Sequence, residues 1–266
     1  MTAAMTKLLN IPISPFGLKV KMAMLEKGIP FETREPDLEA APAGCDAELN
    51  ADTSPRLEIP LLIDGNVRVF DSKVILEYLE ERWPTRPMLP ATPAERARVR
   101  MLEEICGTTY EAVVWGIYEI TTMGRVGGRR QEALLARGRE QVHGLNAWLE
   151  RQLEGRAWFN GDAFGWGDCS AFPHVHAADL LGCPPAPGRL VTWLATARER
   201  PSARQLDREF TEWLQSTPIN RPTDTSGTWK RLYKAHRLEW MIRSGGLDVV
   251  SDGIANENIR FSREIC

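Results

Sequence analysis

Hydrophobic and polar residues alternate most clearly in the first third of the chain, where they predict a hairpin followed by a helix. The apolar run 61–63 ends at the dipeptide Asp64-Gly65, which is favoured in two-residue hairpin turns, and residues 67–70 alternate as a returning strand does. Apolar residues at helical spacing then follow over 75–83. The predicted order in this part of the chain is therefore strand, turn, strand, helix.

Shorter patterns precede the hairpin. Residues 7–13 and 29–34 are predicted strands, and residues 17–27 between them are a predicted helix. The segment 35–52 is rich in Ala, Pro and acidic residues and has only weak periodicity, so it is predicted to be a polar helix and loop. The order of elements up to Pro84 becomes β-α-β-α-β-β-α.

Beyond this unit the pattern changes to long helices. Four prolines between residues 84 and 93 predict a linker, and two long amphipathic segments follow over 94–122 and 129–153. Two further helices are predicted over 190–200 and 202–214, so the second part of the chain should be entirely helical. The last stretch, 216–266, is predicted to hold a basic helix over 229–243, a short helix and a strand over 259–261. Its role stays open between covering a cleft and fixing a dimer.

Residues 161–168, GDAFGWGD, come before the apolar segment 169–181 and resemble the capping motif G-D-x-F-[ST]-x-A-D of the glutathione transferases. The resemblance places Gly165 at the cap position and Asp168 as the acid that bonds the backbone N–H of the cap. An isolated acid at the start of an apolar helix also fits a general base, but a carboxylate that bonds nearby backbone N–H groups favours the cap. Because glycine provides no side-chain bond of its own, the cap should be weaker by a few tenths to about 1 kcal/mol.

Composition narrows the choice of partners. With 266 residues there is material for two domains, and a net charge of −3 with basic residues spread along the chain makes nucleic acid an unlikely partner. No apolar run approaches the roughly 20 residues that span a bilayer, and the start of the chain lacks a secretory apolar region, so a cytoplasmic protein is expected. The five cysteines show no zinc spacing, and His174 and His176 are interpreted as structural, so no metal is expected.

Two features of the hairpin unit predict a binding site. Pro60 has no N–H and fits best at the first position of its strand. If the Ile59–Pro60 bond is cis, the Ile59 backbone turns outward and can pair with an extended, peptide-like ligand. Asp71 and Ser72 at the start of the next helix offer N–H groups and a hydroxyl, which suit a carboxylate. Together these features predict a site for a small acidic peptide.

Ser14 has two interpretations. It precedes Pro15 at the predicted start of the first helix, where its hydroxyl would serve as an N-cap. A hydroxyl at a strand-to-helix turn also suits donation to a thiolate, whose pKa the helix dipole would lower. The residues around Ser14 alone favour the cap.

Three stretches resemble the serine-type cytosolic glutathione transferases. SPFGLKVKMAMLEKGIPFE over 14–32 is similar to the S-P-F-x-x-[RK]-V opening of the plant tau class. SPRLEIPLLIDG over 54–65 resembles the family motif NPxGxVP-x-L-x-x-[DN]-G, and FDSKVILEYLEERWP over 70–84 resembles [EQ]-S-x-x-I-x-x-Y-L. Departures from these motifs occur at three positions, where the family more often has Asn, Gly and Glu: Ser54, Leu57 and Asp71.

The resemblance implies a fold and a division of the chain. The fold is a thioredoxin-like α/β N-terminal domain of order β-α-β-α-β-β-α followed by an all-α C-terminal domain. The implied parts are a glutathione-binding domain, a linker, an electrophile-binding domain and an extension beyond the usual fold, over residues 1–84, 85–93, 94–215 and 216–266.

The resemblance also implies an activity and a site. The protein would be a detoxifying transferase that activates the thiol of its co-substrate glutathione for attack on a hydrophobic electrophile, as a cytoplasmic homodimer without a metal. Ser14 becomes the expected catalytic partner of the thiolate. The glutathione residues would be Ile59, Pro60, Asp71, Ser72, Phe16 and Glu58, and the electrophile pocket would contain Tyr110, Trp115 and Tyr118, with Phe16 beside them. Lys19, Lys21 and Arg56 are expected on the solvated surface rather than on the glutathione carboxylates.

Other functions fit the same residues. A glutathione-dependent dehalogenase, an ether-cleaving enzyme or a peroxidase would use the same site, and a non-catalytic relative would act as a binding or regulatory protein. Serine at position 14 argues against disulfide exchange, because an alcohol cannot form a mixed disulfide.

Overall fold

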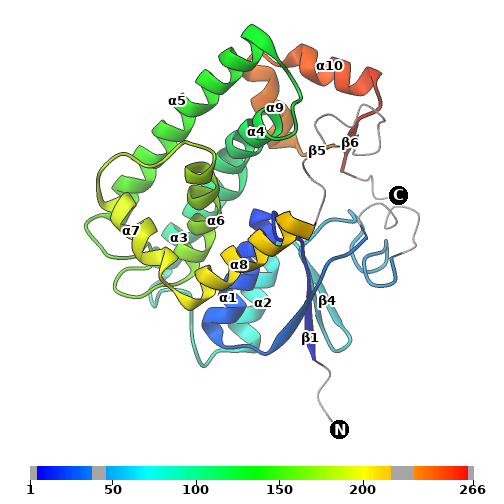
Figure 1. Ribbon diagram of the computed structural model, residues 1–266. Coiled ribbons are helices and arrows are strands. Elements are labelled where there is room, and N and C mark those ends of the chain that lie inside the picture. The colour runs from blue at the N-terminus through cyan, green and yellow to red at the C-terminus, as the bar shows by residue number, and fades with distance from the viewer. Residues whose placement is uncertain (1–4, 38–45, 217–230, 263–266) are drawn as a thin grey trace.

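The computed structural model describes residues 5–37, 46–216 and 231–262, in which a small sheet domain precedes a larger helical one (Figure 1). The elements of the first domain are β1 (Thr6–Leu9), α1 (Pro15–Lys27), β2 (Phe31–Arg34), β3 (Leu61–Asp64), β4 (Val67–Phe70) and α2 (Ser72–Arg82). The strands form one sheet of order β2-β1-β3-β4, in which β1 and β2 are parallel and the other pairs are antiparallel.

The register of this sheet brings three chain segments to one edge. Leu61 at the start of β3 pairs with Leu9 at the end of β1 and with Phe70 at the end of β4. Since β3 runs against both neighbours, the segment after β1, the segment before β3 and the segment after β4 all leave the sheet at that edge. These segments carry Ser14, Ile59 and Asp71.

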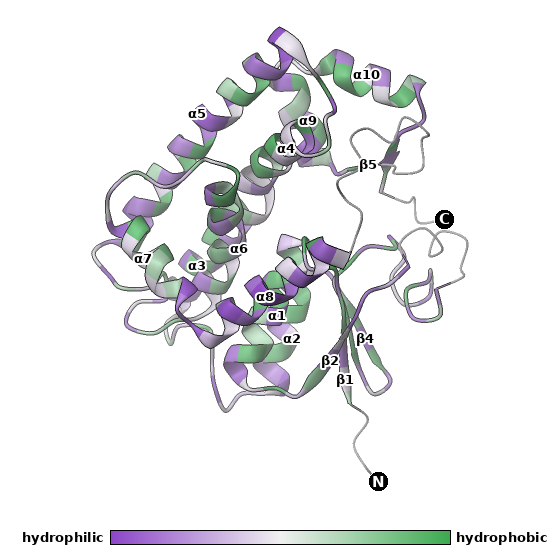
Figure 2. Ribbon diagram, in the orientation of Figure 1, coloured by the Kyte–Doolittle hydropathy of each residue, from purple (hydrophilic) through white to green (hydrophobic). Residues whose placement is uncertain are grey.

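The core of the first domain lies between the sheet and its two helices. Leu8 and Leu62 on the sheet, Val20 on α1 and Ile75 on α2 have no exposed surface. Figure 2 shows hydrophobic and hydrophilic residues along both helices; α2 buries one face, whereas α1 is buried on most sides because the second domain also covers it. α1 ends at Gly28, whose φ of 67° is readily adopted by glycine, so the predicted end of this helix is confirmed.

Between residues 93 and 216 the regular elements of the second domain are all helical. Its elements are α3 (Pro93–Ile105), a π-helical turn (Cys106–Tyr110), α4 (Glu111–Thr121), α5 (Gly128–Leu153), α6 (Trp166–Leu180), α7 (Arg189–Arg198) and α8 (Pro201–Ser216). α6 packs against both α1 and α3 and therefore joins the two domains.

The C-terminal extension folds onto this helical domain. It contains β5 (Arg231–Tyr233), α9 (Ala235–Arg243), α10 (Leu247–Ala255) and β6 (Ile259–Phe261), and β5 pairs with β6 in a parallel two-stranded sheet. α9 lies along α4 (Figure 1). The Trp240 indole of α9 donates to Gln141 of α5 at 2.6 Å. The extension is therefore an integral layer of the helical domain.

Several predicted boundaries need correction. The helix predicted over 94–122 is interrupted by the π-helical turn, and the helix predicted over 229–243 starts at Ala235, because residues 231–233 form a strand. Residues 229 and 230 lie outside the described part. The weak helix predicted over 35–52 falls partly on residues 38–45, which also lie outside the described part. Residues 35–37 have no regular structure, and residues 46–52 form bends and turns. The strand over 259–261 is confirmed.

Two lysines expected on the surface are buried. Lys19 and Lys21 of α1 are 2% and 5% exposed, because α1 is covered by α6 and α8 of the second domain. Lys19 forms an ion pair with Glu103 of α3, and Lys21 forms one with Glu209 of α8. The expectation that both side chains are solvated is wrong, since their helix face is a domain interface. None of the described helices combines the length and apolar character needed to span a membrane.

Candidate active site

Ser14 is the N-cap of α1. Its Oγ accepts a hydrogen bond from the Gly17 N–H at 3.4 Å, and Pro15 occupies the start of the helix, where no N–H is required. A larger residue at position 17 would displace the Asn10 side chain, since a Cβ there would lie 1.6 Å from its Oδ1. The Ser14 hydroxyl accepts one bond as a cap and keeps its O–H available to donate elsewhere.

The segment before β3 presents the backbone of Ile59. The Ile59–Pro60 peptide bond is cis. Among the described residues the Ile59 N–H and C=O have no hydrogen-bond partner. Leu57, which stands where the family motif has glycine, has a φ of 52° and is 4% exposed, so it adopts the left-handed conformation while packing in the interior.

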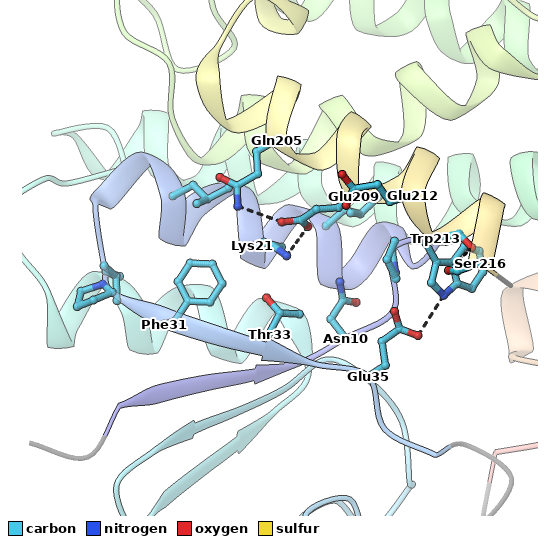
Figure 3. Close-up of a pocket in the computed structure, with 15 residues that line it drawn as sticks. Asn10, Lys21, Phe31, Thr33, Glu35, Gln205, Glu209, Glu212, Trp213 and Ser216 are labelled. Carbon is cyan, nitrogen blue, oxygen red and sulfur yellow. Dashed lines mark hydrogen bonds and ion pairs between the residues drawn. The ribbon is translucent and has the colours of Figure 1, made fainter.

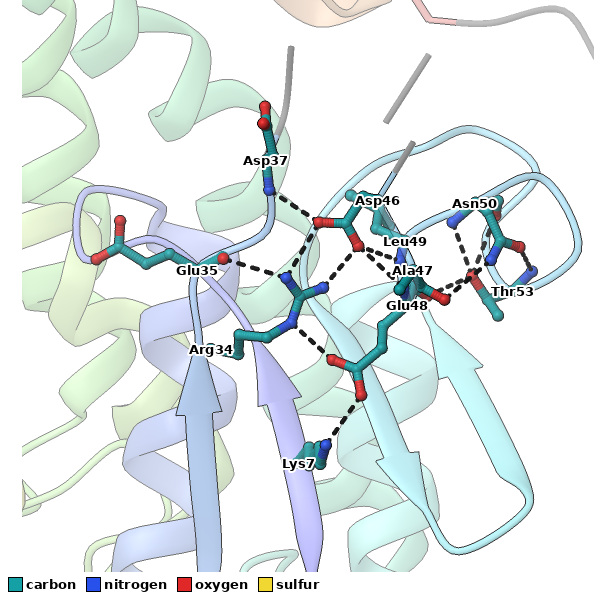
Figure 4. Close-up of polar contacts among 10 residues, drawn as sticks. All are labelled: Lys7, Arg34, Glu35, Asp37, Asp46, Ala47, Glu48, Leu49, Asn50 and Thr53. Carbon is teal, nitrogen blue, oxygen red and sulfur yellow. Dashed lines mark hydrogen bonds and ion pairs between the residues drawn. The ribbon is translucent and has the colours of Figure 1, made fainter. Parts of the chain in front are cut away.

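An ionic network fixes the chain that leads to this segment (Figure 4). Arg34 at the end of β2 lies 2.6 Å from Oδ1 of Asp46 and 2.6 Å from Oε2 of Glu48, which also contacts Lys7 of β1 at 3.0 Å. The hydrogen bond from Arg34 holds the pKa of the Asp46 carboxyl well below its usual range. Residues 46–48 are thereby attached to two strands of the sheet.

Asp71 and Ser72 form the start of α2. The Asp71 Oδ1 accepts from the Lys73 N–H at 2.9 Å, and its Oδ2 lies 3.3 Å from the Arg56 guanidinium. Burial raises the pKa of the Asp71 carboxyl, but the Lys73 N–H and nearby positive charge lower it, and the net change is downward. The carboxylate is thus ionised at neutral pH. Ser72 is 6% exposed, and its hydroxyl has no hydrogen-bond partner among the described residues.

Phe16 and Glu58 both contact the C-terminal extension. The ammonium of Lys234 lies 4.6 Å from the centre of the Phe16 ring and 2.9 Å from Oε2 of Glu58. The Ser262 hydroxyl donates to the other oxygen of Glu58 at 2.8 Å. Residues from both ends of the extension therefore meet at Glu58, directly beside Ile59.

The three aromatic residues predicted for the electrophile pocket have different environments. Tyr110 is fully buried and its hydroxyl donates to Asn146 at 2.7 Å, which is the environment of a core residue. Trp115 and Tyr118 lie with ring centres 5.7 Å apart, and the Arg237 guanidinium of α9 lies 3.9 Å from the centre of the Trp115 ring. The extension thus covers one face of the Trp115 ring.

Buried charged groups lie beneath the site, where the two domains meet. Glu103, paired with Lys19, also accepts from the Trp166 indole at 2.7 Å. His174 of α6 packs at 6.4 Å between ring centres from Phe16, and burial lowers its pKa to about 3, so its imidazole is neutral. His176 instead lies 2.9 Å from Asp207. Within the described ranges no group of three or more His, Cys, Asp or Glu side chains gathers as a metal site.

A separate pocket of about 740 Å³ lies between α1, β2 and α8 (Figure 3). Lys21, Glu35 and Trp213 line it, and the Trp213 indole donates to Glu35 at 3.0 Å. None of the predicted site residues lines this pocket, so it is distinct from the candidate active site.

The arrangement defines a class of protein before any comparison. A thioredoxin-like sheet that presents a free backbone edge and a helix N-terminus, joined to a helical domain, is the expected framework of a protein that binds a small acidic peptide. Residues 8–87 match the family model described as Glutathione S-transferase, N-terminal domain, and residues 132–205 match the model described as Glutathione S-transferase, C-terminal domain. The chain belongs to the glutathione S-transferase family.

Relatives agree with this assignment. The chain is 34% identical to glutathione S-transferase U6 of Arabidopsis thaliana over 61% of this chain and 66% of the relative, and 30% identical to a probable glutathione S-transferase of Nicotiana tabacum over 63% and 69%. The match thus spans about two thirds of each relative. A glutathione S-transferase from Rhodospirillum rubrum superposes with a TM-score of 0.66 at 26% identity, over 76% of this chain and 91% of that one. The rice glutathione S-transferase solved in complex with glutathione superposes with a TM-score of 0.63 at 25% identity, over 81% of this chain and 100% of that one.

Sequence patterns left open whether the extension covers a cleft or fixes a dimer, and they did not identify the residues by which it reaches the candidate site. Three residues of the extension contact the candidate site, and none of them was predicted there. Lys234 contacts Glu58 and Phe16, Ser262 contacts Glu58, and Arg237 contacts Trp115. The available signal was the basic helical pattern with Trp240 on its apolar side, which indicates a packing face but does not identify the surface that it covers.

Proposed function

We propose that this protein is a glutathione transferase, which ionises the thiol of glutathione and directs it at a hydrophobic electrophile. The observation that carries the proposal is the convergence of Ser14, Ile59 and Asp71 on one edge of the sheet, in a chain of this family. Each of these residues offers a group that one part of glutathione requires.

The tripeptide would dock by backbone pairing and by charge. The unpaired N–H and C=O of Ile59, followed by Pro60, suit the backbone of the cysteinyl residue. The Ser72 hydroxyl at the N-terminus of α2 suits the γ-glutamyl carboxylate, and the Asp71 carboxylate suits the amino group. Phe16 and Glu58 adjoin the bound cysteinyl residue.

Ser14 would donate its O–H to the thiolate. The cap interpretation and the catalytic one are compatible, because capping uses the acceptor side of the hydroxyl and thiolate stabilisation uses its proton. After the thiol proton leaves to solvent, the thiolate attacks an electrophilic carbon. A carbon–sulfur bond forms, and the leaving group departs with the electron pair of the bond that breaks.

The electrophile side of the site would be formed by Phe16, Trp115 and Tyr118. We leave Tyr110 out, because its side chain has no exposed surface. We also propose residues 1–84 as the glutathione-binding domain, 85–93 as the linker and 94–215 as the electrophile-binding domain. We propose 216–266 as an extension, whose described residues 231–262 pack on the last of these. A cytoplasmic homodimer is proposed on the same family grounds.

Titration calorimetry with glutathione, together with turnover of a chlorodinitrobenzene, tests this function. Binding should be measurable below millimolar glutathione, and Ser72→Ala should weaken it by roughly threefold to tenfold, which corresponds to the loss of one hydrogen bond. Ser251→Ala is the control, because that exposed hydroxyl bonds only to the Leu247 carbonyl of its own helix in the described structure. No heat of binding at millimolar glutathione would refute the proposal.

A further inference from the structure

Lys234 lies between the two halves of the proposed glutathione site. Its ammonium contacts Glu58, the residue before Ile59, at 2.9 Å and the ring of Phe16, two residues after Ser14, at 4.6 Å. The side chain is 21% exposed. The bond to Glu58 occupies one N–H donor, and the remaining donors have no partner among the described residues. The ammonium therefore lies beside two residues, Phe16 and Glu58, that are within two residues of Ser14 and Ile59 in the chain.

The extension also holds Lys234 in place independently of any ligand. Lys234 lies between β5, which pairs with β6, and α9, which is attached to α4. Three residues after Lys234, Arg237 pairs with the buried carboxylate of Glu111 at 3.0 Å. The backbone at Lys234 is therefore fixed by the fold of the helical domain, and the ammonium is held by Glu58 and the Phe16 ring, so little side-chain freedom is lost when an anion binds.

The charges around the sulfur position explain what the extension adds. In the described structure, Asp71 is paired with Arg56, and Lys19 is paired with Glu103. Glu58 on its own would place a negative charge beside Ile59 and disfavour a thiolate. The extension brings two positive groups toward Glu58, Lys234 and Arg260.

Arg260 is the less usual of these two groups. Its guanidinium forms no hydrogen bond or ion pair within the described residues. Burial lowers the pKa of Arg260 and the charge of Glu58 raises it, with a net change downward. Among the described residues around Glu58, Lys234 and Arg260 thus bring one positive charge more than Glu58 can neutralise, and the neutral His174 does not alter this balance. A bound anion would neutralise this additional positive charge.

We propose that the C-terminal extension is part of the catalytic site, and that Lys234 is the counter-ion of the glutathione thiolate beside Ser14. The inference rests on the proposed function. The extension converts a loop that carries the negative Glu58 into a site with a positive balance, and it does so only when the helical domain and the extension are docked. Lys234 contacts the sulfur of the co-substrate, and Glu58 positions Lys234.

The test measures the pKa of the bound thiol. The full-length protein is saturated with glutathione, and the ultraviolet absorbance of the thiolate is recorded as a function of pH. Lys234→Met keeps the aliphatic stem and removes the charge. It should raise the apparent thiol pKa by about one unit and lower kcat with a chlorodinitrobenzene roughly tenfold at pH values below that pKa. The dissociation constant for glutathione should change by less than about threefold, because the carboxylate and backbone contacts remain.

Two further variants separate charge from structure. Lys234→Arg should restore most of the thiolate, and Arg243→Met on the same helix is the matched control, since its exposed side chain pairs only with Glu239 in the described structure. If Lys234→Met fails to fold, Arg260→Met also removes one positive charge near Glu58. It should likewise raise the apparent pKa of the bound thiol.

The outcomes distinguish this proposal from the one on which it rests. If the wild type binds no glutathione, the function itself is refuted. If the wild type binds and ionises glutathione but Lys234→Met titrates with the wild-type pKa, the counter-ion role alone is overturned. A loss of glutathione affinity with an unchanged thiol pKa also overturns it, because Lys234 would then bind a carboxylate instead.

Discussion

The indole of Trp240 lies so close to the backbone of Gly116 that a Cβ on this glycine would be 2.0 Å from the ring. The same indole would be 3.5 Å from a Cβ at Gly138, so the ring fits between two helices at positions without side chains. This contact attaches α9 to α4 and α5. It is one of the contacts, with the Arg237–Glu111 pair, that hold the described part of the extension and Lys234 in place.

Replacing Gly116 should detach the extension. Gly116→Val places methyl groups in the volume of the indole, and overpacking of this kind costs roughly 1–3 kcal/mol. We expect a lower free energy of unfolding in urea and greater solvent exposure of tryptophan in the fluorescence spectrum. Gly144→Ala on α5 is the matched control, because its Cβ would meet no atom within 4 Å. Equal stability of Gly116→Val and the wild type would contradict the packing.

The extension should also respond to acid through Glu111. Burial raises the pKa of this carboxyl, but the charge of Arg237 and the bonds from His236 and Arg237 outweigh burial and lower it to about 2. A carboxyl with a depressed folded pKa stabilises the fold above its unfolded value of about 4.3 and loses this contribution as the pH falls toward 2. Unfolding measured between pH 5 and about 2 should therefore show a steep loss of stability.

The variant Glu111→Gln isolates this effect. It should be less stable than the wild type at pH 7, since Arg237 is left buried without its partner, and the difference should shrink as the pH falls. A difference that stays constant from pH 7 to pH 3 would show that Glu111 is not the titrating group.

Asp168 should prove structural. Its buried carboxylate accepts from the N–H groups of Phe159 and Gly165 at 2.8 and 3.0 Å and from the Trp193 indole at 2.8 Å. Burial raises its pKa to about 6 despite these bonds. Asp168→Ala leaves several buried donors unpaired and should cost roughly 3–5 kcal/mol. The turnover of the fraction that remains folded should be unchanged, and a fall in that turnover would identify Asp168 as a catalytic group.

Ser14→Ala should separate the two roles of this hydroxyl. Loss of the cap should lower the free energy of unfolding by about 0.5–2 kcal/mol. Loss of the hydrogen-bond donor should raise the pKa of the thiol of bound glutathione by about one unit. Thr92→Ala removes the N-cap of α3 and is the matched control, because Thr92 bonds the Glu95 N–H at 3.2 Å. Thr92→Ala should lower stability and leave the thiol pKa unchanged. If both variants leave that pKa unchanged, Ser14 is a cap alone.

The N-terminal domain could be predicted in detail because its signals are local. Asp64 and Gly65 predicted the hairpin, and the turn is shifted by one residue because Asp64 still pairs with Val67. Asp71 was predicted at the start of α2 and is its N-cap. In these cases the turn chemistry, the alternation and the cap lie within a few residues of each other, so sequence order carries the information.

The extension could not be predicted in the same way because its contacts are distant along the chain. Ser262 and Glu58 are 204 residues apart, and nothing near either residue indicates the other. β5 forms a strand by pairing with β6. Its three residues are too few for the sequence to show the alternation of hydrophobic and polar residues that predicts a strand. Lys19 was misjudged for a related reason, since its polar helix face is covered by the second domain.

The π-helical turn over Cys106–Tyr110 changes the phase of a helix that the sequence presents as continuous. A turn of this kind accommodates one additional residue, which rotates the following side chains by about 100° about the axis. α3 therefore directs its apolar side toward α6, whereas α4 directs Gly116 toward α9 and Ile117 toward Gly138 of α5. A single irregular turn thus divides one long helix into a half that holds the two domains together and a half that receives the C-terminal layer. The angular offset between these halves therefore sets the side of the helix on which α9, which begins one residue after Lys234, is packed.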